Sequence, residues 1–299
     1  DMLTTTLLAT RADIYIAPAM NVHMYNHPAV SENMKKLDRW GYHFIEPGAG
    51  YLACGYVGKG RLEEPLTIIE VIKNHQKNAE LLAGKKVLVS AGPTREKIDP
   101  VRFISNRSTG KMGFAIAEVA AQFGAEVTLV AGPVELKTSH KNIRRIDVVS
   151  AQDMYEAMLD EFPKADIVIK SAAVADYRPK VTYDQKMKKS NNDLHIEFER
   201  TKDILKTLGE KKTSQFLVGF AAETNNPLEY GKKKLTEKNL DAIVINNVLE
   251  KGAGFGVDTN IVTYLNKKKR QENLPLASKR EIAEQILQLI VDDMKDDEN

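Results

Sequence analysis

Residues 85–113 read KKVLVSAGPTREKIDPVRFISNRSTGKMG, and this stretch decides the fold. Its apolar start predicts a strand, and the Ala-rich segment 113–123 predicts a helix that ends at Gly124. Glycines and hydroxyls between strand and helix offer free N–H groups to a phosphate. Ser105 and Met112 stand where a Walker loop has Gly and Ser or Thr, and G-x-G-x-x-G is absent too. The alternative of a long, ordered loop without a ligand stays open.

Further apolar runs repeat the character of this first strand. They alternate with helical patterns, as buried parallel strands do in α/β proteins. We therefore expect a Rossmann-like, doubly wound parallel sheet that binds its ligands at the carboxyl ends of its strands. The runs lie at residues 125–131, 166–172, 216–220 and 242–245, and a hairpin is expected from 260–265 and 273–277.

The N-terminal part carries shorter signals. Residues 13–17 predict a strand, residues 31–40 a helix with Ser31 as N-cap, and residues 66–83 a helix that stops at Gly84. We expect two domains, with the boundary between residues 83 and 84.

Charge and cysteine content exclude several classes of protein. Lys plus Arg number 43 against 41 Asp plus Glu, which is too even to indicate nucleic-acid binding. The apolar runs are too short to span a membrane. A lone cysteine, Cys54, excludes an internal disulfide and, with no signal peptide evident, predicts a cytoplasmic protein.

The segment SAAVADY, residues 171–177, follows a buried strand. Its small residues would let a ligand approach the backbone, and Asp176 would direct a carboxylate into the same crevice, as a Mg²⁺ ligand or hydroxyl acceptor would. A lone Asp after a strand is more often a turn former or a helix cap. This signal is weak by itself.

Three lysine groups follow on the same sheet. Such groups usually form a solvated face, but after a phosphate-type loop several point charges would suit a triphosphate. The two interpretations have equal weight here. The lysines are Lys186, Lys188 and Lys189, then Lys202 beside Asp203, then Lys232 to Lys234 with Lys238.

The first unit offers Asn21 in PAMNVHMY and Cys54 in a Gly-rich loop. The Asn21 amide could bind a carboxylate, and Cys54 could supply a proton. On residue type alone, a buried cysteine without chemistry is the more common case. His23 and His27 flank a turn, so we favour a non-metal interpretation.

Taken together, these motifs resemble the family of bifunctional coenzyme A biosynthesis proteins, which join a phosphopantothenoylcysteine decarboxylase to a phosphopantothenate–cysteine ligase. The resemblance covers almost the whole chain. PAMNVHMY is similar to the decarboxylase signature, with Tyr25 in place of the usual Trp, and GYLACGYVGKGRL to its cysteine-bearing flap. AGPTREKIDPVRFISNRSTGKMG, SAAVADYRP and GFAAET are similar to the ligase.

The resemblance implies two reactions. The ligase activates 4′-phosphopantothenate with CTP and Mg²⁺ to an acyl-cytidylate, which L-cysteine then attacks to release CMP. The decarboxylase uses FMN to convert the product to 4′-phosphopantetheine. The family also implies a homo-oligomer, with a ligase dimer and a higher assembly through the flavin domain.

Residue roles carried over by motif complete the expectation. Asn106 matches the asparagine that turns over the acyl-cytidylate, Asn21 the residue that binds the substrate carboxylate, and Cys54 the acid that protonates the enethiol. The nucleotide site is expected from Ser171, Ala172, Ala173, Asp176, Lys186, Lys202, Asp203, Ile204, Phe220, Lys234 and Lys238, with Asp176 as the Mg²⁺ ligand.

The departure from the family pattern concerns the N-terminus. No histidine precedes His23, whereas the family has a catalytic histidine and an FMN phosphate loop upstream of PAMN. The resemblance therefore implies that the chain carries only the C-terminal part of the flavodoxin-like decarboxylase domain, with an incomplete FMN site.

Two other functions stay open. A short-chain-type NAD(P) oxidoreductase would use Ser108-Thr109-Gly110 and the pair Tyr230 and Lys234, although no acidic residue ends the strand at 129–131 to bind a ribose. A non-catalytic scaffold is the second alternative.

Overall fold

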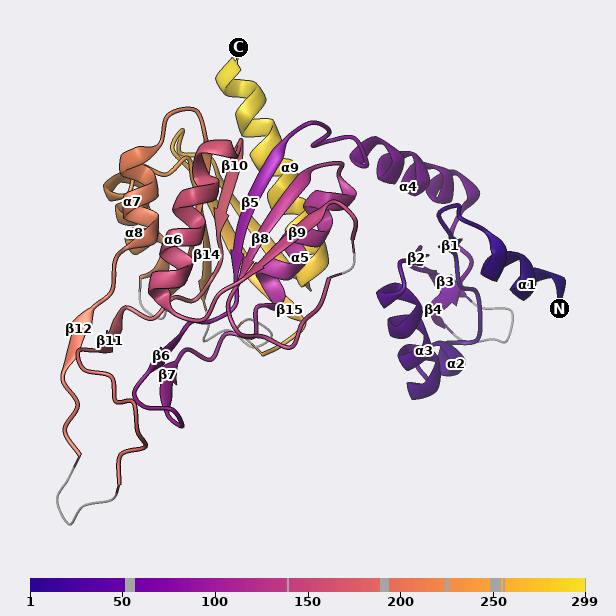
Figure 1. The fold of residues 1–299 in the computed structure, drawn as a ribbon. Coiled ribbons are helices and arrows are strands. Elements are labelled where there is room, and N and C mark those ends of the chain that lie inside the picture. The colour runs from indigo at the N-terminus through magenta and orange to yellow at the C-terminus, as the bar shows by residue number, and fades with distance from the viewer. Residues whose placement is uncertain are drawn as a thin grey trace. The chain divides into compact units, whose positions relative to one another are not determined.

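The computed structural model describes residues 1–51, 57–138, 140–188, 194–223, 226–247, 254 and 256–298. The chain divides into two compact units, unit 1 with residues 1–78 and unit 2 with residues 79–299 (Figure 1). Each unit is described by itself.

Unit 2 is built on an eight-stranded sheet with the order β16-β15-β14-β13-β10-β5-β8-β9. The strands from β14 to β9 pair in parallel, and β15 and β16 continue the sheet as an antiparallel hairpin. Numbered along the chain, the parallel strands follow the order 3-2-1-4-5-6 of doubly wound nucleotide-binding folds. The predicted sheet is confirmed, with the C-terminal hairpin as an added edge. The strands are β5 (Lys86–Ala91), β8 (Glu126–Ala131), β9 (Ile143–Asp147), β10 (Ile167–Lys170), β13 (Phe216–Glu223), β14 (Ala242–Asn247), β15 (Thr259–Asn266) and β16 (Gln271–Ser278).

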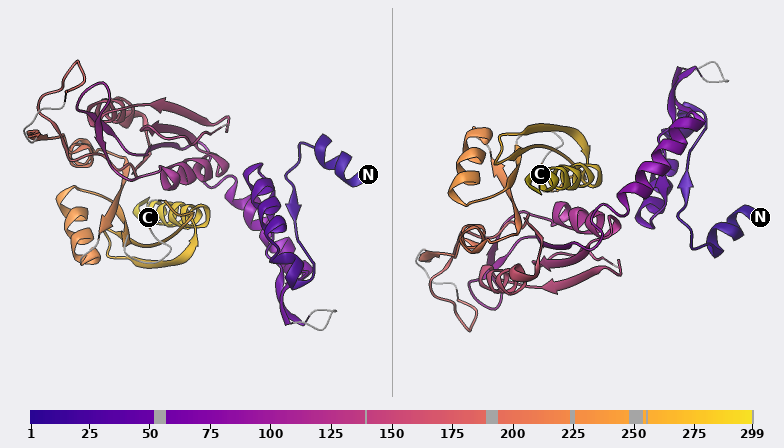
Figure 2. Two further views of the ribbon diagram at one scale, coloured as in Figure 1. Left: turned by 90° about the horizontal axis from the view of Figure 1, so that it is seen from below. Right: turned by 90° about the horizontal axis from the view of Figure 1, so that it is seen from above.

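Helices cover both faces of this sheet (Figures 1 and 2). α5 (Lys111–Gln122) and α9 (Lys279–Glu298) pack on one face, and α6 (Ala151–Glu161), α7 (Ile204–Lys211) and α8 (Pro227–Glu237) on the other. A short 3₁₀ turn, Phe162–Lys164, follows α6. Because both faces are covered, the central strands are apolar without alternation.

Local sequence signals fix several helix starts. The Ser150 hydroxyl accepts a hydrogen bond from the Asp153 N–H at 3.1 Å, and the Asp153 carboxylate accepts one from the Ser150 N–H at 2.8 Å. Ser278 and Glu281 form the same reciprocal pair at the start of α9. Both pairs are capping boxes, which satisfy N–H groups at the start of each helix.

Two small excursions lie beyond the carboxyl ends of the sheet strands (Figure 1). One is the hairpin of β6 (Arg95–Lys97) and β7 (Phe103–Ser105), inside the segment predicted as a loop. The other, called the arm, runs from residue 177 to residue 200 and is closed at its base by β11 (Tyr177–Pro179) and β12 (Phe198–Arg200). Strands of three residues are too short for a periodic signal in the sequence.

Unit 1 has short elements. β1 pairs with β2 in parallel, and β3 with β4 antiparallel. The helix predicted from Ser31 begins at Pro28 instead, where the ring nitrogen of His27 accepts the capping hydrogen bond from the Ala29 N–H. The helix predicted to run to Gly84 ends at Asn78 and is followed by turns. The elements are α1 (Met2–Ala9), β1 (Tyr15–Ile16), α2 (Val22–Tyr25), α3 (Pro28–Arg39), β2 (His43–Phe44), β3 (Gly48–Tyr51), β4 (Val57–Arg61) and α4 (Pro65–Asn78).

Within the part of the chain that the structure describes, no helix combines the length and the apolar character needed to cross a lipid bilayer.

Candidate functional site

The carboxyl ends of β5 and β10 mark the point where the connections of the sheet diverge. The two strands are neighbours, but β5 leads to α5 on one face and β10 leads to α7 on the other. Ligands of open parallel sheets bind in the crevice at such a point. The loops that leave these two strands therefore carry the candidate site.

Hydrogen bonds join these two loops. The hydroxyl of the fully buried Thr94 accepts one from the Ala175 N–H at 3.0 Å, and the Gly92 carbonyl accepts one from the Ala173 N–H at 2.9 Å. The segment after β10 is thereby held against the segment after β5, although the two are far apart in the sequence.

The first turn of α5 approaches β5 closely. A Cβ on Gly113 would lie 2.6 Å from the Ala91 Cβ, a separation that real Cβ atoms do not reach. The helix begins after Gly110, which has a φ of 79° and gives no side-chain cap. The N-terminal N–H groups of α5 thus face the crevice, as expected for an anion-binding loop.

Two adjoining cavities occupy this crevice. The α5 cavity, of about 500 Å³, lies at the N-terminus of α5 and along residues 170–174. The α7 cavity, of about 610 Å³, lies at the start of α7 and beside the C-terminal half of α8. The wall between them is made by residues that line both: Lys170, Val174, Asp176, Phe220 and Lys234.

All but one of the predicted ligase residues meet at these cavities. Lys186 is the exception and lines neither of them. Asn106, Ser171, Ala172 and Ala173 line the α5 cavity, Lys202, Asp203, Ile204 and Lys238 line the α7 cavity, and Asp176, Phe220 and Lys234 line both.

The α7 cavity is strongly basic. Its carboxylates are Asp176 and Asp203, whereas its cations are Lys170, Arg200, Lys202, Lys206, Lys234 and Lys238. Asp203 caps α7 by accepting from the Lys206 N–H at 3.0 Å and forms an ion pair with Lys238 at 2.8 Å. Burial alone would raise the pKa of Asp203, but these two contacts lower it below its usual value. The remaining positive charge suits a polyanion.

Asn106 lies at the rim of the α5 cavity, between β7 and α5. Its side-chain nitrogen donates a hydrogen bond to the Ala173 carbonyl at 2.9 Å. The amide therefore links the two loops of the crevice.

A buried carboxylate attaches the arm to the β6–β7 hairpin. Asp99 accepts hydrogen bonds from the Arg102 side chain and from the Met187 N–H, the latter at 3.1 Å. Arg102 in turn donates to the Met187 carbonyl at 2.9 Å. Burial would raise the pKa of Asp99, but hydrogen bonds from Arg102 and from backbone N–H groups hold it well below its usual range. The position of Lys186, next to Met187, is thus set by a residue that sequence reasoning missed.

The predicted Mg²⁺ ligand, Asp176, is exposed at the junction of the cavities. Among the described residues, no group of three or more His, Cys, Asp or Glu side chains could hold a metal. A metal bound through Asp176 would need most of its oxygen ligands from a substrate and water. Phosphate oxygens can supply them for Mg²⁺.

In unit 1, Asn21 caps the short helix α2, where its side-chain oxygen accepts a hydrogen bond from the His23 N–H at 2.8 Å. Cys54 lies outside the described residues. Of these two predicted decarboxylase residues, the described part of unit 1 therefore places Asn21 alone.

Four lysines that line the cavities escaped the sequence reasoning, namely Lys111, Lys170, Lys206 and Lys279, and the pKa of two of them is shifted by burial. Lys170 is the last residue of β10 and lines both cavities, and Lys279, the first residue of α9, lines the α5 cavity. Burial lowers the pKa of each to about 8. Lys170 had a signal in the sequence, because a lysine that ends an apolar parallel strand stands where ligands bind.

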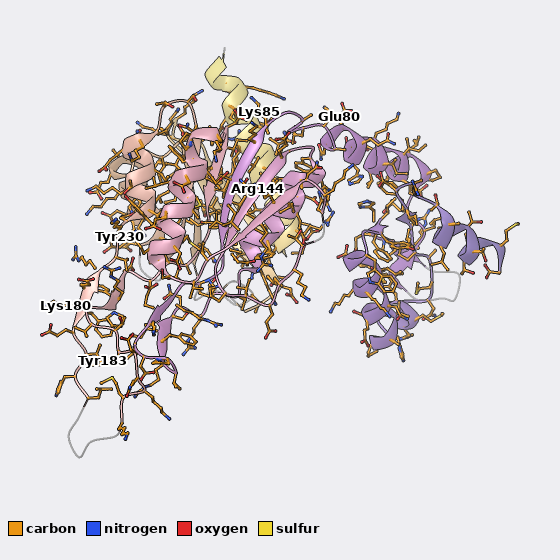
Figure 3. All side chains as sticks on the ribbon, viewed as in Figure 1. Glu80, Lys85, Arg144, Lys180, Tyr183 and Tyr230 are labelled. Carbon is orange, nitrogen blue, oxygen red and sulfur yellow. The ribbon has the colours of Figure 1, made fainter. Side chains whose placement is uncertain are left out.

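The oxidoreductase alternative does not match the site. Its catalytic pair would be Tyr230 and Lys234, but the Tyr230 side chain is 50% exposed and lines neither cavity (Figure 3). Only Lys234 of the pair reaches the crevice.

Known protein families match both units of the chain. The family model described as the DNA/pantothenate metabolism flavoprotein C-terminal domain matches residues 82–294, and the Flavoprotein model matches residues 1–77.

Among curated relatives, the coenzyme A biosynthesis bifunctional protein CoaBC of Bacillus subtilis is 56% identical over 292 residues, which are 97% of this chain and 72% of that protein. A protein from an unknown prokaryotic organism, named cysteine/cysteine sulfinic acid decarboxylase, is 46% identical over 97% of this chain and 82% of its own length. Among solved structures, the C-terminal domain of a CoaBC protein is 50% identical, with a TM-score of 0.63, over 73% of this chain and 99% of its own.

Proposed function

The chain belongs to the family of bifunctional coenzyme A biosynthesis proteins, which have a ligase and a decarboxylase role, and from that premise we propose how unit 2 performs the ligation. In this proposal CTP occupies the α7 cavity, and 4′-phosphopantothenate enters through the α5 cavity. The carrying observation is that the two cavities adjoin and share a wall, so that two substrates can meet at one point.

The charge of the α7 cavity supports a nucleoside triphosphate. Six cationic side chains line it against two carboxylates, and one of those carboxylates, Asp203, is already paired with Lys238. A triphosphate carries several negative charges, and lysines bind such groups as point charges. Asp176 would hold Mg²⁺, which would neutralise part of the charge on the phosphates.

The reaction then proceeds in two balanced steps. An oxygen of the pantothenate carboxylate attacks the α-phosphorus of CTP, the bond to the β-phosphate oxygen breaks, and pyrophosphate leaves. The amine of L-cysteine next attacks the acyl carbon, loses a proton and displaces CMP as the amide bond forms. Asn106 lines the α5 cavity and offers an amide that can stabilise the charge of the tetrahedral intermediate.

For unit 1 we propose the decarboxylase roles by motif alone. Asn21 binds the carboxylate of the phosphopantothenoylcysteine product, and Cys54 supplies the proton to the enethiol. The match of residues 1–77 to the Flavoprotein family supports FMN as the cofactor of this unit.

A homodimer is proposed through the arm and the β6–β7 hairpin, which contact each other. The arm and the hairpin expose large apolar side chains. Such exposure is typical of surfaces that bind a partner. A second copy of the chain would cover them. The exposed apolar side chains of the arm and the β6–β7 hairpin are Val101, Phe103, Tyr177, Val181, Tyr183 and Phe198.

Light scattering tests this proposal. The wild-type chain should have the mass of a dimer, and the Phe103→Ser variant should have a mass closer to that of the monomer. A monomeric wild-type chain would contradict the proposal.

The test of the ligase function uses the 299-residue chain with CTP, Mg²⁺ and 4′-phosphopantothenate. Without cysteine, we expect about one equivalent of pyrophosphate per site and a bound acyl-cytidylate. With cysteine, CMP and pyrophosphate should be released continuously in equal amounts. Release of neither product by a folded chain would refute the assignment.

A further inference from the structure

Among the described residues, Lys170 and Lys234 are the two basic side chains that line both cavities of the crevice, and Lys170 is the one carried by a strand of the sheet. It is the last residue of β10, at the centre of the sheet, and its side chain lines both the α5 cavity and the α7 cavity. Lys234, the other lysine of the shared wall, belongs to helix α8. Lys202, Lys206 and Lys238 line only the α7 cavity.

The environment of Lys170 leaves its charge available. Its ammonium group donates one hydrogen bond, to the Ala172 carbonyl at 2.8 Å. An ammonium group has three donors, and no carboxylate among the described residues lies within ion-pair distance of it. A part-buried cation without a carboxylate partner is costly in a fold, unless a ligand supplies the negative charge.

The surrounding charges bear on the protonation of this lysine. Asp176, which follows β10, and Asp203, the cap of α7, favour the charged form, whereas Lys234 and Lys238 of α8 and its C-cap oppose it. Burial is the largest influence and lowers the pKa of Lys170 to about 8. The group is therefore mainly charged at pH 7, and a phosphate beside it would favour the charged form further.

The proposed ligation requires a cation at this junction. In the first step, a carboxylate oxygen bonds to the α-phosphorus while the bond to pyrophosphate breaks, and negative charge builds up on the oxygens of that phosphoryl group. The reacting atoms must lie where the two cavities meet, since each cavity holds one substrate. A charge placed there in advance stabilises the transition state without reorganisation.

We propose that Lys170 contacts the α-phosphoryl group of the nucleotide and is a catalytic residue of the activation step. This inference rests on the proposed ligase function. Its experiment therefore begins with the wild-type chain, whose release of CMP and pyrophosphate tests that function separately.

The decisive variant is Lys170→Gln. Glutamine keeps a donor that can reach the Ala172 carbonyl but removes the positive charge, so the strand end stays formed. Lys206→Gln is the matched control, because Lys206 lines only the α7 cavity and is exposed. Lys170→Arg restores the charge in a different shape. Pyrophosphate release is measured against CTP concentration for all four proteins.

For Lys170→Gln we expect kcat of pyrophosphate release to fall roughly 10²-fold, with KM for CTP changed by less than about threefold. Lys206→Gln should instead raise KM with little change in kcat, and Lys170→Arg should recover at least about tenfold in rate. A Lys170→Gln protein with wild-type kcat would refute the inference, and so would a change in KM alone. If circular dichroism showed that the Lys170→Gln protein is unfolded, the Lys170→Arg protein would test the inference in its place. A Lys170→Arg protein with wild-type KM for CTP and kcat lowered less than about tenfold would support a catalytic role of the positive charge. A folded but inactive Lys170→Arg protein would contradict that role.

Discussion

The two units differ in how firmly packing holds their motifs. In unit 2, an eight-stranded sheet between two layers of helices buries dozens of apolar side chains, and the motif residues extend from the ends of its strands. In unit 1, the buried apolar side chains among the described residues are Ile45, Pro18 and Pro47. α1 and α4 bury none of theirs. The motif residues of unit 2 therefore line shared cavities, whereas in unit 1 the described motif residue Asn21 caps a short helix.

The difference shows what a motif by itself supplies. The residues of SAAVADY are positioned by β10 and by hydrogen bonds to the loop after β5, so their place follows from the sheet. Asn21 in PAMNVHMY is fixed by a four-residue helix that it caps. A motif determines a site only where a core fixes the elements that carry it.

A leucine-to-alanine substitution in each unit should show the largest difference between them, in the free energy of unfolding. Leu217→Ala removes a side chain with 0% exposure, and we expect it to lower the free energy of unfolding by about 2–5 kcal/mol. Leu8→Ala, at a side chain that is 85% exposed, should change it by less than about 0.5 kcal/mol. Urea unfolding followed by circular dichroism measures both. Equal losses would mean that unit 1 is packed more firmly than its exposure indicates.

Asn106→Ala should separate the two half-reactions. If its amide serves acyl transfer, that step slows roughly 10²–10³-fold while activation continues. Quenching the reaction and finding accumulated acyl-cytidylate would agree with this. Because the amide also donates to the Ala173 carbonyl, equal loss of pyrophosphate and amide formation would show that it shapes the crevice instead.

Lys186→Gln tests the one predicted residue that lies outside the cavities. If the arm delivers Lys186 to the triphosphate, loss of a charge-assisted contact of about 1.5–3 kcal/mol should raise KM for CTP roughly 10- to 150-fold. Lys180→Gln is the control on the same arm, where the lysine pairs with Glu197 at 3.3 Å, and it should change KM by less than about twofold (Figure 3). An unchanged CTP dependence in Lys186→Gln would assign that lysine to the solvated surface.

Much of unit 2 could be predicted from the sequence, because its strands are buried on both faces and give continuous apolar runs. Residues 166–172 identify β10 and, with it, the position of Ser171 to Asp176. The hairpin of β6 and β7 could not be predicted in this way. Its strands have three residues each, and their pairing depends on the turn held by Asp99 and Arg102.

The missed site residues have a different cause. The end of an apolar strand marks the place of Lys170, but its burial and that of Lys279 are set by the fold, because a sequence does not show which of many lysines a fold encloses. The misplaced start of α3 has a local cause. Ser31 is a common N-cap type, but Pro28 suits the first helical position and His27 caps it.

The central claim is that unit 2 contains a complete ligase site. It is tested most directly by comparing residues 79–299 with the 299-residue chain in the four-component reaction of CTP, Mg²⁺, 4′-phosphopantothenate and L-cysteine. We expect the two proteins to form the amide with kcat/KM for CTP within about threefold of each other, because the lining residues of both cavities belong to unit 2. A folded 79–299 protein that releases no pyrophosphate, beside an active 299-residue chain, would contradict the account.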